Sequence, residues 1–138
     1  MRIGEGDVCV VIDWRDGAED ILAAVKAFLP PGYLSGERRT DGIWTLSAGG
    51  RPASEIRFTE GNPALFVNAV NEILAPEFEI RQFRPIEGDG YSFLLRPSGW
   101  WMQLEDRHPD LLEKYFITTE RLARYASRSW LGRLFSKP

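Results

Sequence analysis

One stretch of the sequence, residues 105–110, brings together ionisable side chains of the types used in catalysis. It contains the only histidine of the chain, and its residues are Glu105, Asp106, Arg107, His108, Pro109 and Asp110. Carboxylates beside an imidazole could exchange protons with a substrate or bind a metal ion. A zinc site is not expected, because no second histidine lies three or four residues away. Pro109 instead favours a helix start, with His108 as its cap and Asp110 in a first turn stabilised by the helix dipole.

Two further acids, Asp13 and Asp16, directly follow an apolar, β-branched run. Acids at the end of a strand in an open α/β sheet can bind Mg²⁺. Asp16 is better explained as the N-cap of the next helix, because Glu19 follows three residues later, as in a capping box. Asp13 is expected to pair with Arg15 or with a neighbouring strand. A structural role is therefore favoured for both acids.

The sequence motifs of common enzyme classes are missing from this chain. The glycines at 49–50 and 88–90 have the spacing of turns rather than of a nucleotide-binding loop, and no serine lies in a nucleophile-elbow motif. We therefore predict a protein that is not an enzyme and has no metal ion or cofactor. The alternative is a small hydrolase or ligand-binding domain that uses Asp13, Asp106 or His108.

Charge is distributed unevenly along the chain. Residues 1–120 carry 12 Lys/Arg against 20 Asp/Glu, a net charge of −8. Residues 121–138 carry no acid and a net charge of +5, from Arg121, Arg124, Arg128, Arg133 and Lys137. An acidic body with a basic tail suggests a protein that meets a charged partner. Direct nucleic-acid binding by the body is not expected, because phosphate neutralisation needs a basic face.

Length and composition indicate one folded domain. The chain has 138 residues, of which 43% are hydrophobic, and five are tryptophans. The single cysteine, Cys9, cannot form an internal disulfide and lies in an apolar run, which favours a buried structural thiol. The first residues contain no hydrophobic signal core, and no stretch has the length of a membrane span. We therefore expect a cytoplasmic protein.

Hydrophobic periodicity predicts an α+β domain with a largely antiparallel sheet, two helices on one face of it and further C-terminal helices. The predicted order is β-α-β-β-α-β-β-β-α-α, with residues 33–42 as a polar loop. The predicted strands are 8–14, 43–47, 55–59, 77–83, 91–96 and 100–105. The predicted helices are 16–29, 62–74, 110–116 and 120–127. The first strand is apolar throughout, which suits a strand covered on both faces.

The predicted hairpin of residues 91–96 and 100–105 has two distinct faces. If Leu95 pairs with Trp100 across the turn, Phe93 meets Met102 and Tyr91 meets Leu104, all on a core face. Alternation puts Leu94 beside Trp101 on the opposite face. In one arrangement the C-terminal helices cover this second face and make it another layer of core, which the apolar first strand favours. In the other arrangement one end stays open, and an apolar pair with polar surroundings has the composition of an interface centre.

The boundary near residue 120 divides an acidic α+β body, residues 1–120, from a basic amphipathic helix or tail, residues 121–138. Within the tail, Trp130, Leu131, Leu134 and Phe135 would lie on one helical face. Packing of the tail on the acidic body is the favoured arrangement, followed by a flexible end. A peripheral membrane adaptor is a third possibility, but a helix of two turns would bind lipid weakly.

The chain resembles the small immunity proteins encoded beside bacterial contact-dependent toxins. The resemblance lies in size, acidity, helices on an antiparallel sheet, and aromatic residues among carboxylates, as in Trp100–Asp106. It implies a non-catalytic protein that binds and neutralises a cognate toxin domain. No functional residue can be transferred from this family to the chain, because its members resemble one another more in function than in sequence.

A toxin that cuts nucleic acid presents a basic cleft, and an acidic partner is steered toward such a cleft and blocks it. On this hypothesis the partner is a cognate toxin, for example a nuclease. The predicted anchors are Leu94 and Trp101. The predicted charged surroundings are Glu79, Glu87, Asp89, Glu105 and Asp106.

Overall fold

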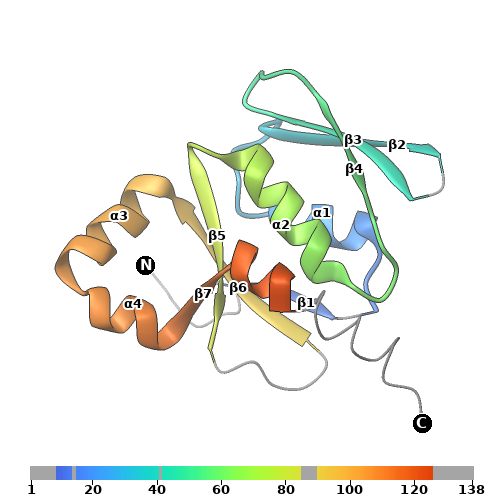
Figure 1. Cartoon of the computed structure of the whole chain (residues 1–138). Coiled ribbons are helices and arrows are strands. Elements are labelled where there is room, and N and C mark those ends of the chain that lie inside the picture. The colour runs from blue at the N-terminus through green and yellow to red at the C-terminus, as the bar shows by residue number, and fades with distance from the viewer. Residues whose placement is uncertain (1–8, 14, 41, 85–89, 126–138) are drawn as a thin grey trace, which may run out of the picture.

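Two antiparallel sheets with helices between and beside them make up the computed structural model, which describes residues 9–13, 15–40, 42–84 and 90–125 (Figure 1). The α+β class with antiparallel pairing is confirmed. The elements are β1 (Val10–Asp13), α1 (Ala18–Lys26), β2 (Leu34–Thr40), β3 (Ile43–Ala48), β4 (Ser54–Arg57), α2 (Pro63–Leu74), β5 (Phe78–Phe83), β6 (Gly90–Pro97), α3 (Ser98–Arg107), α4 (Pro109–Tyr115) and β7 (Phe116–Thr118). Residues 119–125 are also helical.

The sheets are separate in their hydrogen bonding. One has four strands in the order β1-β6-β5-β7, and the other has three in the order β2-β3-β4. Helices α1 and α2 lie between the two sheets (Figure 1), and they contact each other and strands of both. The main core is continuous across these layers, because fully buried side chains from each of them meet there: Ile12, Ile21, Val25, Leu46, Phe66, Val70 and Phe93.

Local chemistry sets the ends of α2 as predicted. Asn62 is the N-cap, Pro63 occupies the first helical position, and the helix ends at Leu74, shortly before Pro76. The start of α1 differs from the prediction by one residue: its N-cap is Gly17, whose backbone N–H donates to a carboxylate oxygen of Asp20 at 3.0 Å. Asp16, which we expected to cap this helix, accepts instead from the backbone N–H of Asp13 at 3.0 Å.

The prediction of a strand at residues 100–105 was wrong. These residues lie in α3, which begins directly after β6, with Pro97 as its N-cap. In a helix, positions 101 and 104 share one face, and Trp101 and Leu104 do pack together toward the sheet. The strand that pairs with β5 on its other side is β7, through Gln82 opposite Ile117.

Residues 34–40, predicted as part of a polar loop, form β2. Its exposed side chains face solvent, and few residues of the strand turn toward the core. One of them is Gly36, where an added Cβ would lie 2.6 Å from Leu46 Cδ2 and 3.0 Å from Leu22 Cδ1. Sheet pairing with β3 therefore overrides the weak strand propensity of this polar segment.

The prediction that β1 is covered on both faces was also wrong. Val10 and Ile12 are buried in the main core, but Val11 is 65% exposed. The helices on that side of the four-stranded sheet, α3 and α4, contact β5, β6 and β7 instead. At the C-terminal end, residues 119–125 begin with the backbone N–H of Arg121 donating to Thr118 Oγ1 at 3.2 Å, and Leu122 joins the core. The predicted tail from residue 126 onward lies outside the described residues.

Candidate functional site

Helices α3 and α4 form a hairpin on the side of the four-stranded sheet that faces away from the three-stranded one (Figure 1). The two helices carry four of the six large apolar side chains that are exposed in the described ranges: Trp100, Met102, Leu111 and Tyr115. The same two helices expose four acids, Glu105, Asp106, Asp110 and Glu113. We call these eight residues the α3–α4 surface.

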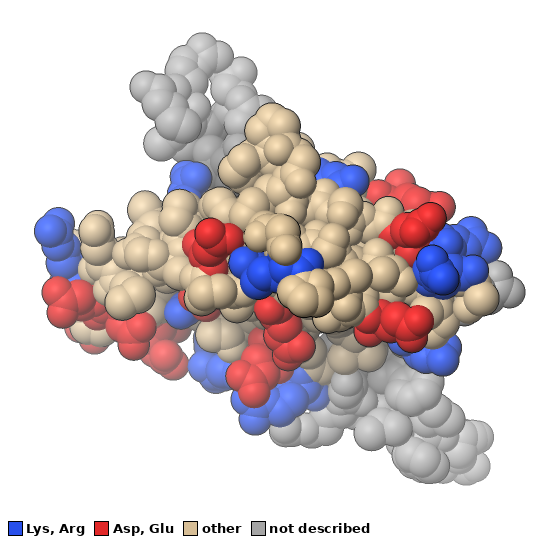
Figure 2. Space-filling view, turned by 90° about the horizontal axis from the view of Figure 1, so that it is seen from above, with Lys and Arg blue, Asp and Glu red and all other residues tan. Residues whose placement is uncertain are grey.

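The α3–α4 surface is acidic with few bases. Figure 2 shows red side chains beside tan surface at the left end of the molecule, with blue ones at its tip; α3 and α4 occupy this end in Figure 1. Met102 lies three and four residues before Glu105 and Asp106, so these side chains project from one side of α3. The bases Arg107 and Lys114 are exposed on the same hairpin, and Lys114 Nζ lies 5.3 Å from the ring centroid of Tyr115.

Trp101 fixes the hairpin to the sheet. Its side chain is 1% exposed, and its indole Nε1 donates to the carbonyl oxygen of Glu79 at 2.9 Å. The ring of Phe116 meets it edge-on at a centroid distance of 5.0 Å, and the Arg81 guanidinium lies 4.9 Å from its centroid. Because aromatic and cation contacts surround this indole, α3 is held in one position on the sheet.

The two predicted anchors, Leu94 and Trp101, are not surface residues. Both belong to a second core cluster with Leu112, to which Phe83, Leu104 and Phe116 add partly buried rings and side chains. Helices α3 and α4 cover this face of the sheet, so the covered arrangement favoured from sequence is correct. The predicted helix at 120–127 does not take part, because residues 119–125 pack on the main core through Leu122. Met102 and Trp100, which were both predicted to lie on the core face, are 69% and 39% exposed. The correction follows from the helix, which turns 101 inward and 100 and 102 outward.

The predicted acids have separate outcomes. Glu105 and Asp106 are exposed on α3, as a contact role requires. Glu79 is half-buried and forms an ion pair with Arg81 at 2.7 Å, so its charge is compensated inside the protein rather than presented to a partner. Glu87 and Asp89 lie outside the described residues.

The residues of the enzyme alternative are not gathered in one described cluster. Asp13 lies opposite Gly90 at one end of β6, while α3 starts from the other end. Hydrogen bonds from the side chain and backbone of Arg15 lower the pKa of Asp13 to about 2. His108 occupies the cap position between α3 and α4, as predicted. Within the described ranges, no group of three His, Cys, Asp or Glu side chains is placed to hold a metal ion.

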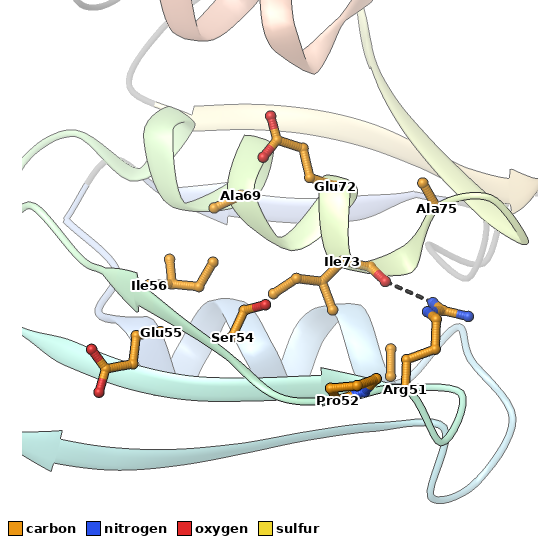
Figure 3. A pocket seen from close by; sticks show the side chains of 10 residues that line it. Arg51, Pro52, Ser54, Glu55, Ile56, Ala69, Glu72, Ile73 and Ala75 are labelled. Atoms are coloured by element: carbon orange, nitrogen blue, oxygen red, sulfur yellow. Dashed lines mark hydrogen bonds between the residues drawn. The ribbon is translucent and has the colours of Figure 1, made fainter.

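A groove that the sequence analysis missed lies between α2 and β4, with a volume of about 490 Å³ (Figure 3). At one end Arg51 donates to the carbonyl oxygen of Ile73 at 2.7 Å and contacts Glu77 at 3.2 Å. The hydroxyl of Tyr33 also donates to Glu77, and these bonds hold the pKa of that carboxyl below its usual value. No sequence motif marks these residues, because they come from four separate segments. Arg51 lies in the β3–β4 turn and Ile73 in α2, while Glu77 directly precedes β5 and Tyr33 directly precedes β2.

Comparisons with other proteins add no relative: no protein-family model matches the chain, and no curated protein or solved structure matches it either. None of the helices in the described ranges is long and apolar enough to cross a bilayer. The fold and surface therefore define the chain as an α+β protein of two antiparallel sheets that presents an acidic, aromatic helical hairpin.

Proposed function

We propose that this chain is a non-catalytic immunity protein that binds and neutralises a cognate bacterial toxin domain through the α3–α4 surface. The observation that carries the proposal is the concentration of exposed apolar and aromatic side chains on one helical hairpin, which buried side chains fix to the sheet. Exposed apolar side chains that lie close together among polar residues are typical of protein-interaction sites. Tryptophan, tyrosine and methionine are enriched at the centres of such sites.

The packing of the hairpin on the sheet supports this role. A surface that keeps its shape before binding loses less conformational freedom when the partner binds. Trp101 and Leu112 anchor α3 and α4 to the sheet, so Trp100 and Met102 are presented from a fixed base. The edge-on contact between the Trp100 and Trp101 rings, at 5.0 Å, extends this anchoring to the surface.

The charge of the hairpin favours a basic partner. Glu105, Asp106, Asp110 and Glu113 would face a cationic surface, and opposite charges speed the encounter between two proteins. A nuclease toxin has such a surface, because its active cleft binds phosphates. In this proposal the protein acts in the cytoplasm, where a nuclease would reach its substrate. Neutralisation follows from blocking the cleft, so no chemical step by the immunity protein is needed.

The test is a calorimetric titration of the full chain with the C-terminal domain encoded by the gene immediately upstream. One-to-one binding at nanomolar to micromolar concentration, together with loss of that domain's toxicity, would support the proposal. Absence of heat at micromolar concentrations would reject it for that partner. Binding without loss of toxicity would reject neutralisation while keeping a binding role.

A further inference from the structure

Strand β4 lies at the edge of the three-stranded sheet. It pairs with β3 from Ser54 opposite Leu46 to Arg57 opposite Ile43, and in the part of the chain that the structure describes no strand pairs with its other side. An edge strand presents backbone N–H and C=O groups that can pair with another extended chain. No bulge interrupts the β3–β4 pairing. The edge is therefore open to strand addition.

The groove beside β4 has an apolar floor. Ile56 of β4 and Ile73 and Ala69 of α2 line it, and Figure 3 shows Ile56, Ser54 and Ile73 on the inner side between the strand and the helix. The space exists because the facing positions hold small side chains, Ser54 on the strand and Ala69 on the helix. A floor of this kind accepts one or two aliphatic side chains.

Acidic side chains lie at both margins of the groove. Glu72 rises from α2 and Glu55 from β4, and both are exposed (Figure 3). Neither forms an ion pair within the described ranges, whereas Glu77 at the end of the groove is occupied by Arg51. The Arg51 guanidinium is itself held by the carbonyl oxygen of Ile73. Arg57 of β4 is also exposed, on the same face of the strand as Glu55. Two acids and one base thus remain beside the groove, and this net negative charge favours a cationic ligand.

We propose that this groove binds an extended basic peptide segment of a partner protein, which adds to the edge of β4 as a fourth strand. Main-chain hydrogen bonds to an edge strand supply affinity, and alternate side chains supply specificity. An aliphatic side chain of the peptide packs on Ile56 and Ile73. The flanking Lys or Arg side chains point to the opposite face of the sheet, where Glu55 lies, and Glu72 adds negative charge at the α2 margin. The four residues of β4 span roughly 13 Å, which matches a peptide of about four to six residues.

This site is independent of the immunity proposal. The α3–α4 surface lies on the far side of the four-stranded sheet, and the two sites share no residue. Failure of toxin binding therefore leaves the groove proposal standing, and failure of peptide binding leaves the toxin proposal standing.

The experiment is a titration of the ¹⁵N-labelled full chain with the peptide acetyl-Thr-Val-Lys-Val-Lys-Thr-amide, followed by amide chemical shifts. We expect saturable shifts confined to β4, α2 and the β3–β4 turn. The same peptide with glutamate in place of both lysines is expected to cause no saturable shift. A version N-methylated at alternate amides is expected to bind more weakly, because it cannot complete the strand pairing.

Matched variants distinguish binding in the groove from a general effect of the protein's net charge. Glu55→Lys with Glu72→Lys is expected to weaken peptide binding by at least about tenfold. The control, Glu19→Lys with Glu60→Lys, makes the same change in net charge at exposed acids that do not line the groove and should leave binding within about twofold. Ala69→Leu fills the groove without changing charge and should also weaken binding, whereas Ala27→Leu, at the exposed end of α1, should not.

Three results would overturn the proposal. These are shifts absent at millimolar peptide, equal weakening by the groove and control charge reversals, and tight binding of the N-methylated peptide. Dispersed amide spectra of each variant establish that it is folded, so a loss of binding can be assigned to the groove.

Discussion

The indole Nε1 of Trp101 donates to the carbonyl oxygen of Glu79 at 2.9 Å, a contact that joins α3 to β5. Glu79 at the same time pairs through its carboxylate with Arg81, whose guanidinium lies over the Trp101 ring. Backbone, ion pair and aromatic ring thus form one unit beneath the α3–α4 surface. The unit explains how a helix with exposed Trp100 and Met102 stays in place.

Replacing Trp101 should destabilise the fold strongly. Trp101→Ala is expected to lower the free energy of unfolding by about 3–5 kcal/mol, because it removes a buried ring and leaves a cavity. Trp101→Phe should cost less, since it keeps an aromatic ring and loses the bond to Glu79. Urea unfolding monitored by circular dichroism measures both. Trp100→Ala is the control, and an equal loss of stability in that variant would contradict the burial assigned to Trp101.

The exposed residues of the hairpin should matter for binding rather than stability. If the toxin proposal holds, Trp100→Ala is expected to weaken toxin binding by about 2 kcal/mol or more, since aromatic residues dominate interface energies. Glu105→Lys combined with Asp106→Lys should mainly slow association, which surface plasmon resonance can measure at two salt concentrations. Val11→Ala, at an apolar side chain on β1 that is 65% exposed, should leave affinity unchanged. Weakening by all of these variants alike would argue against a contact confined to the hairpin.

A glycine in β2 should tolerate no side chain. Gly36→Ala is expected to cost about 1–3 kcal/mol, because the new Cβ would overlap Leu46 Cδ2 at 2.6 Å. Gly99 offers a matched comparison: no atom within 4 Å meets its added Cβ, and it lies in α3. Gly99→Ala should therefore be neutral or stabilise by up to about 1 kcal/mol. Thermal or urea unfolding distinguishes the two, and equal effects would contradict the close approach of β2 to the core.

A buried polar network should hold residues 119–125 against the body. Thr119 Oγ1 accepts from Asn71 Nδ2 at 3.0 Å and donates to Asn68 Oδ1 at 2.9 Å, while Asn71 Oδ1 accepts from the backbone N–H of Ile80 at 2.7 Å. Thr119→Val is expected to cost about 1–3 kcal/mol, because the half-buried amide groups of Asn68 and Asn71 lose their bonds to the buried hydroxyl. Thr119→Ser keeps the hydroxyl and should cost less. Hydrogen exchange of residues 119–125 should accelerate in the valine variant, and unchanged exchange would show that the network does not anchor this helix.

The carboxyl of Glu77 should contribute to stability in a pH-dependent way. Hydrogen bonds from Tyr33 and Arg51 lower its pKa from the usual value near 4.5. Because the folded-state pKa is the lower one, this contribution is present above the unfolded-state pKa and is lost as pH falls through the folded-state pKa. Between pH 7 and pH 3 the free energy of unfolding should therefore decrease less for Glu77→Gln than for the wild-type chain, as measured from unfolding curves. The control is Glu60→Gln, at an exposed carboxylate, and an equal change there would remove the assignment to Glu77.

Several elements follow from the sequence alone because their signals are local. Asn62 and Pro63 start α2, Pro76 follows its end, and Pro109 starts α4, since capping and the missing proline N–H act within one turn. The apolar stripes that direct α1 and α2 onto the sheets depend only on helical spacing. The same local rules predicted the α+β class.

Only the tertiary structure decided which side of the segment at residues 100–105 faces the core. Alternation and helical spacing both fit Trp100, Trp101 and Met102, but they turn opposite side chains inward, so the strand prediction exchanged buried and exposed residues. The helix forms because its Trp101 can be buried against Leu94 and bonded to Glu79, contacts that join residues distant in the chain. The groove between α2 and β4 depends in the same way on two elements meeting in space, and for that reason no local pattern in the sequence marks it.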